Sequence, residues 1–159
     1  MAGTAEDQGV NFVCEPNLYI FSCVDSESKS GPVKFGIEWQ KLAQNSPIFK
    51  GLFHTPFKEL PIPQPREAIE LVLKFLYTPP WCKFEITPKI VVQILPFVLT
   101  YQVTPLLEIV KNTSCYGYAT KLKELAEEHH LPELQIRAER QEADDRDMAK
   151  RYADYRGGN

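Results

Sequence analysis

The sequence of 159 residues contains no long apolar run, and none of its apolar stretches approaches the roughly 18 residues of a membrane-spanning helix. It also has no excess of basic residues, because 21 aspartates and glutamates outnumber 18 lysines and arginines and give a net charge of −3. Nucleic acids and anionic membrane surfaces both attract proteins with a basic face. The sequence therefore predicts neither nucleic acid nor a membrane as a partner.

Motifs of metal sites and of common enzymes are missing. No cysteines form a Cys-x-x-Cys pair, and two of the three histidines are adjacent instead of lying four positions apart on a helix. There is no Gly-x-Ser-x-Gly motif and no glycine-rich phosphate loop. We expect no enzyme, no catalytic residue, no metal and no cofactor. The residues considered for a metal are Cys14, Cys23, Cys82, Cys115, His54, His129 and His130.

The first residues show no secretory signal, since MAGTAEDQGVNF has neither a basic start nor a long apolar stretch. Thiols of a protein that is not exported stay reduced in the cytosol or nucleus. We therefore expect a cytoplasmic or nuclear protein. Residues 1–16 are small, polar and glycine-containing, and they predict a disordered N-terminus.

Two strands are predicted next. Residues 18–24 are rich in β-branched and aromatic types, which is typical of a buried strand. Val33, Phe35 and Ile37 alternate with polar or small residues, which predicts a second, half-buried strand. The polar stretch between them favours a hairpin with a long loop. Shorter extended pieces are expected at residues 60–63 and 83–86.

Helices follow, and three of them have well-marked starts. Ser46, Thr87 and Thr104 each precede a proline, which combines an N-cap with a proline at the first helical position. The helix ending at Tyr77 is stopped by Thr78-Pro79-Pro80, and Pro96 should kink the helix that contains it. The predicted core includes Phe35, Phe49, Leu52, Leu71, Phe75, Leu76, Ile94 and Val98.

The C-terminal part divides by composition. Residues 113–136 predict a helical extension, because an amphipathic pattern places Leu122, Leu125 and Ala126 on one side. Residues 137–159 alternate acidic and basic side chains without large aliphatics, which predicts a charged tail, helical or disordered. We expect this tail to contribute little to the core.

Three segments, in this order, resemble elements of the BTB/POZ domain. Residues 45–53 (NSPIFKGLF) are similar to its S-x-x-F helix, residues 68–78 (AIELVLKFLYT) to its helix ending in F-L-Y-T-G, and residues 95–107 (LPFVLTYQVTPLL) to its following helix pair. The resemblance covers about residues 17–112. It implies an α/β (α+β) fold, a small sheet flanked by helices, here with a C-terminal helical extension.

The sequence departs from the family in two places. Glu38-Trp39 stands where His-Lys is usual, and Pro79-Pro80 replaces the glycine after F-L-Y-T. The 16 or so residues before the first predicted strand are too few for the strand and helix that many dimeric members place there. The resemblance therefore implies the short form of the fold, like that of Skp1 or elongin C.

The resemblance also implies a function in protein–protein interaction, as a substrate adaptor for a cullin-3 type ubiquitin ligase. Members that bind cullin-3 carry a hydrophobic-x-Glu triplet after the S-x-x-F helix, and Phe57, Lys58 and Glu59 stand there. Tyr101 is a further candidate for the partner surface, with core packing as its alternative. The competing reading is an oligomerising scaffold, or a transcription-related BTB protein, with no cullin contact; a homo-oligomer fits either reading.

Overall fold

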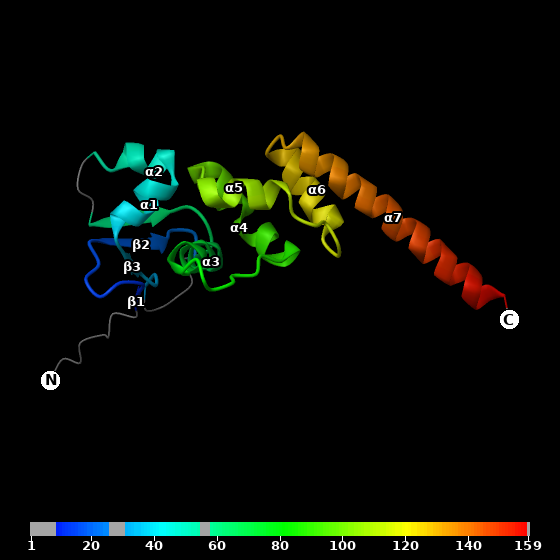
Figure 1. The fold of residues 1–159 in the computed structure, drawn as a ribbon, viewed down its shortest axis with the longest axis horizontal. Helices are drawn as coiled ribbons and strands as arrows, with labels where there is room; N and C mark the ends of the chain where they lie inside the picture. Colours follow the sequence, from blue (N-terminus) through cyan, green and yellow to red (C-terminus); the bar gives the residue numbers. More distant parts are fainter. Residues whose placement is uncertain (1–8, 26–30, 55–57, 159) are drawn as a thin grey trace.

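The computed structural model describes residues 9–25, 31–54 and 58–158. Over these residues the chain forms four strands and seven helices, arranged as a sheet with helices around it and a long final helix that points away (Figure 1). The strands are β1 (Val10–Asn11), β2 (Leu18–Ser22), β3 (Phe35–Ile37) and β4 (Glu59–Ile62). The helices are α1 (Trp39–Asn45), α2 (Pro47–Leu52), α3 (Arg66–Tyr77), α4 (Pro88–Tyr101), α5 (Thr104–Lys111), α6 (Ala119–Glu128) and α7 (Pro132–Gly157). The expected α/β class is confirmed.

The sheet has the strand order β1-β3-β2-β4. Strands β2 and β3 pair antiparallel, as the hairpin prediction requires, and β4 runs parallel to β2. The antiparallel strand β3 returns the chain to the start of β2, and the helical pair α1–α2 then connects β3 to β4 at this same edge of the sheet. Residues 83–86, expected to be extended, form no strand.

Residues 1–16 were expected to be a disordered N-terminus, but strand β1 lies within this range. Val10 and Asn11 pair in parallel with β3, and the Phe12 ring stacks on Tyr77 with 5.3 Å between centroids. Gly36 permits this approach, because a Cβ there would clash with the Asn11 side chain and lie 2.7 Å from Pro16. The described residues before β2 are therefore part of the folded unit.

Two of the three predicted helix caps are present. The hydroxyls of Ser46 and Thr87 accept hydrogen bonds from the backbone N–H of the third residue onward, at 3.1 and 3.3 Å. Thr104 does not cap α5; it is the first residue of that helix, and the preceding cap position holds the buried Val103. Helix α4 continues through Pro96 up to Tyr101, where Gln102 ends it in the left-handed conformation at φ 48°.

The core agrees with most of the prediction and corrects one member. Of the eight predicted residues, Phe35, Phe49, Leu76, Ile94 and Val98 are buried, and Leu71 and Phe75 are half-buried against them. Leu52 is 42% exposed and lies outside the core. The reason is local, because α2 has six residues and turns only the side with Phe49 toward α4.

Helices α6 and α7 form an antiparallel pair at the end of the chain (Figure 1). Gln135 at the start of α7 donates to Glu127 at the end of α6, and Lys123 of α6 lies 3.5 Å from Glu142 in the middle of α7. The two helices therefore run in opposite directions. The tail is helical, and its first part is not the solvated segment expected: Ala138 is buried, and Arg137 Nη1 donates to the carbonyl of Thr113 at 3.0 Å. Residues 143–158 are exposed.

Candidate protein-interaction surface

Helix α2 carries an exposed apolar strip. Ile48 is 37% exposed and Leu52 is 42% exposed, and their spacing of four places both side chains on one side of the helix. Phe49, between them in the sequence, is fully buried and fixes α2 to the core. These two partly exposed aliphatic side chains form a small apolar strip on the surface of α2.

A chain of aromatic rings supports this helix from beneath. Phe49 stacks on Tyr101 with 4.4 Å between centroids, and Tyr101 lies 4.9 Å from Phe97. In the other direction Phe49 stacks on Phe53 at 6.0 Å, and Phe53 contacts Trp39 at 5.6 Å. The rings connect the core to the surface, so α1 and α2 keep a fixed orientation.

Tyr101, a candidate for the partner surface, belongs to this internal chain. It is 9% exposed, and burial raises the pKa of its hydroxyl. Its carbonyl accepts a hydrogen bond from the Ser46 hydroxyl, which also caps α2. Tyr101 therefore positions α2 against α4 and offers a partner almost no surface, so we do not keep it among the docking residues.

The other side of α2 borders an open hollow of about 730 Å³. Residues of α1, α2 and the start of α5 surround it, among them Trp39, Pro47, Lys50, Phe53, His54 and Thr104. Helix α4 contributes none of its lining. The lining combines the aromatic rings of Trp39 and Phe53 with polar side chains such as those of Lys50 and His54.

The predicted triplet is only partly visible. Phe57 lies outside the described residues. Lys58 is exposed, and Glu59 opens β4 with its carboxylate in an ion pair with Lys34. Since the Glu59 side chain remains half exposed, a basic partner group can still reach it. The structure thus places two of the three residues on the surface that follows α2.

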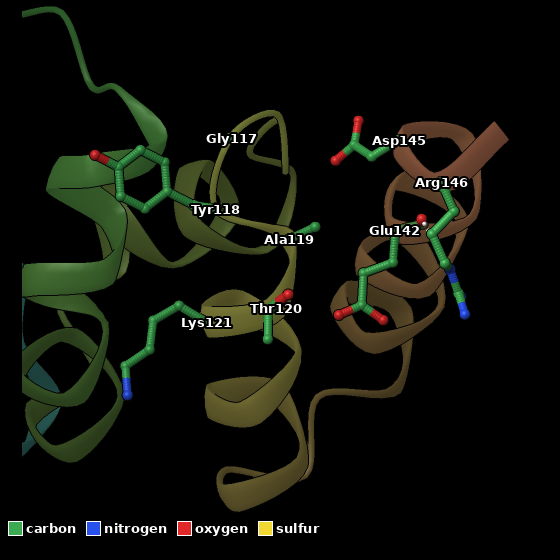
Figure 2. A pocket seen from close by; sticks show the side chains of 8 residues that line it. All are labelled: Gly117, Tyr118, Ala119, Thr120, Lys121, Glu142, Asp145 and Arg146. Atoms are coloured by element: carbon green, nitrogen blue, oxygen red, sulfur yellow. Dashed lines mark hydrogen bonds between the residues drawn. The ribbon is translucent and has the colours of Figure 1, made fainter. Parts of the chain in front are cut away.

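A second hollow, of about 550 Å³, lies between the start of α6 and the middle of α7. Figure 2 shows Glu142 and Asp145 pointing from α7 toward residues 117–121. The pKa of Glu142 is lowered, first by a hydrogen bond with the Thr120 side chain and then by the positive charges of Lys123 and Arg146. Sequence reasoning missed this hollow, because it exists only where the two helices meet.

In the described part of the chain no three His, Cys, Asp or Glu side chains gather where they could hold a metal ion. Within the same residues, no helix is both long and apolar enough to cross a bilayer.

Compared with known proteins, the chain matches no family model and no curated protein sequence.

Proposed function

We propose that the protein is an interaction module that acts as an adaptor, docking a cullin-3 type scaffold through the α2 strip of Ile48 and Leu52 and the residues that follow it. The observation that carries the proposal is the exposure of these two aliphatic side chains on the helix that begins with Ser-Pro-Ile-Phe. The exposed apolar pair would provide an anchor, and Glu59, which follows Leu52 by seven residues in the sequence, a charge for a complementary partner.

The order of elements supports the same proposal. A hairpin, two short helices, a strand parallel to the first, and then α3 to α5 follow each other as the BTB/POZ resemblance implies. Within the motif of residues 45–53, Ile48 and Leu52 are exposed together with Lys50, whereas Phe49 is buried in the core. The cullin partner itself rests on the sequence resemblance.

The test is binding of the recombinant N-terminal region of cullin-3, measured by isothermal titration calorimetry. Ile48→Asp with Leu52→Asp should weaken binding at least about 30-fold, since loss of interface anchors costs about 2 kcal/mol or more. The matched control is Ile136→Asp, because Ile136 is an exposed aliphatic residue on α7, on a different part of the surface. Phe57→Ala tests the triplet separately.

The result that overturns the adaptor proposal is equally direct. If the wild-type protein shows no binding at tens of micromolar, cullin recruitment is excluded and the oligomerising scaffold takes its place. If the control variant weakens binding as much as the double variant, the α2 strip is not the docking site. Thermal melting of each variant separates lost contacts from lost folding.

A further inference from the structure

One side of α7 carries a stripe that begins in the core and continues into solvent. Leu134 and Ala138 are buried against α6, and alternating steps of three and four lead along the same side, through the polar Gln141 and Asp145, to Met148, Tyr152 and Tyr155. Such spacing keeps side chains on one seam of a helix. The stripe therefore extends the α6–α7 seam beyond the point where α6 begins.

The outer half of this stripe has no cover among the described residues. Met148 is 50% exposed, Tyr152 67% and Tyr155 86%, and Figure 1 shows this end of α7 projecting away from the other elements. The rest of the segment is rich in charged residues, so a methionine and two tyrosines at this spacing stand out. Tyrosine and methionine are enriched in protein interfaces.

We propose that this stripe is covered by α7 of a second copy of the chain, packed antiparallel about a two-fold axis near Lys150. In that register Met148 of one copy packs against Tyr152 of the other. Tyr155 of the second copy then lies over Asp145, and Arg156 over Glu142. Each contact occurs twice, as the symmetry of an isologous dimer requires.

Charge complementarity selects a second copy as the occupant. The hollow of Figure 2 is lined by Glu142 and Asp145 together with Lys121 and Arg146. Along α7 itself the charges are uneven, because residues 139–147 hold five acidic and two basic side chains, whereas residues 148–158 hold three basic and one acidic. Reversing a second α7 brings the basic segment of each copy beside the acidic segment of the other. Opposite charges beside a helical seam set partner choice and orientation.

The interface would also continue an existing one. Helix α6 runs antiparallel to α7, so the second α7 would follow the same line as α6 and end at its first turn, near residues 117–121. There its C-terminal end would meet the N-terminal end of α6, a favourable meeting of opposite dipole ends. Near the two-fold axis, Arg151 is already paired with Asp147 at 2.9 Å, which reduces repulsion between the two copies.

The first experiment measures molar mass by light scattering and the dissociation constant by sedimentation equilibrium. The wild-type chain of 18.2 kDa should show about twice that mass at high concentration. Met148→Glu with Tyr152→Glu should weaken association at least tenfold. The control is Ala143→Glu, which is exposed and points away from the stripe, because the nine steps from position 143 to position 152 span about 2.5 turns. It should leave the dimer intact.

A second experiment tests the register by cross-linking with a short bismaleimide. In a background with the exposed thiols Cys14, Cys23 and Cys82 changed to serine, Ala149→Cys should cross-link efficiently, because the two Ala149 residues lie beside the two-fold axis. Ala143→Cys should not, since this register separates its two copies by about 21 Å along the helices.

Three results would overturn the proposal. A wild-type chain that stays monomeric at high concentration leaves the stripe to a different protein. A dimer that survives Met148→Glu with Tyr152→Glu uses another surface. Equal cross-linking at positions 143 and 149 excludes the antiparallel register. None of these outcomes bears on cullin-3 binding, which uses α2, so the two proposals can fail separately.

Discussion

The sheet-containing part of the chain, from β1 to α5, and the α6–α7 pair belong to one continuous hydrophobic core but are built from different side chains. The first part buries three phenylalanines completely, together with many β-branched residues. In the helical pair, the buried side chains are three leucines and three alanines. Alanine lets helices approach closely, yet it removes little apolar surface from water.

This difference teaches where each part is vulnerable. At roughly 25 cal/mol per Å² of buried apolar area, one aromatic side chain stabilises more than several alanines. The sheet part can therefore tolerate loss of a polar contact, whereas the pair depends on its few leucines and on the polar bonds across its seam. Four predictions test this contrast, from the largest expected effect to the smallest.

The largest effect is expected at the centre of the sheet part. Phe49→Ala should lower the free energy of unfolding by about 3–5 kcal/mol, since it removes a fully buried ring and leaves a cavity beneath α2. Denaturant unfolding measures it. Phe53→Ala, four residues later and half-buried, is the control and should cost clearly less. If both variants lower the free energy of unfolding equally, the contacts between the aromatic rings decide stability and the burial of each ring does not.

A smaller effect is expected in the helical pair. Leu134→Ala should cost about 2–4 kcal/mol, because Leu134 is a buried leucine of the α6–α7 seam. Hydrogen exchange should rise first in α6 and α7 and least in β2 and β3. Ile136→Ala removes a side chain of the same size from the exposed side, and its cost should stay within about 0.5 kcal/mol. Uniform loss of protection along the chain would contradict the contrast.

The third prediction concerns the polar joint between α2 and α4. Ser46→Ala removes the N-cap of α2 and the hydrogen bond to the Tyr101 carbonyl, so it should cost about 1–2 kcal/mol. Thr104→Ala is the control, because Thr104 also precedes a proline but caps no helix. Thermal melting distinguishes them. Comparable losses would mean that the serine hydroxyl adds nothing beyond helix propensity.

The sequence predicted most of the sheet part because its signals are local. Alternation marked the hairpin, and Ser46 and Thr87 marked two helix starts that the structure confirms. Strand β1 escaped prediction because two residues carry no periodicity, and only the close approach of Asn11 to Gly36 explains its place. Leu52 was misplaced because hydrophobicity alone does not say which side of a short helix meets the core.

The candidate sites divide in the same way. Lys58 and Glu59 could be named from a motif, whereas the core position of Tyr101 follows from its rings and from the bond to Ser46. The hollow beside Glu142 depends on how two helices meet, which no local pattern encodes. The stripe of α7 follows a helical spacing in the sequence, with Met148, Tyr152 and Tyr155 four and three residues apart. Sequence analysis did not identify it, because most of the neighbouring residues are charged.

The smallest effect is expected from protonating Glu142 in the seam of the helical pair. Its pKa is lowered in the folded protein, chiefly by the hydrogen bond with Thr120, whereas an unperturbed glutamate has a pKa of about 4.3. A lowered folded pKa means that the charged carboxylate favours the folded state. This contribution is fully present above about pH 4.3 and is lost as the pH falls through the lowered folded value.

Acidification should therefore loosen the contact between α6 and α7 before it affects the sheet part. The amide protection factors of both helices, measured from pH 6 downward, should fall more steeply in the wild-type protein than in Glu142→Gln, which keeps the side-chain shape without the charge. Glu139→Gln, on the exposed part of the same helix, is the matched control and should follow the wild-type curve. Parallel curves for the wild type and Glu142→Gln would show that the packing of Leu134 and Ala138 alone holds the seam.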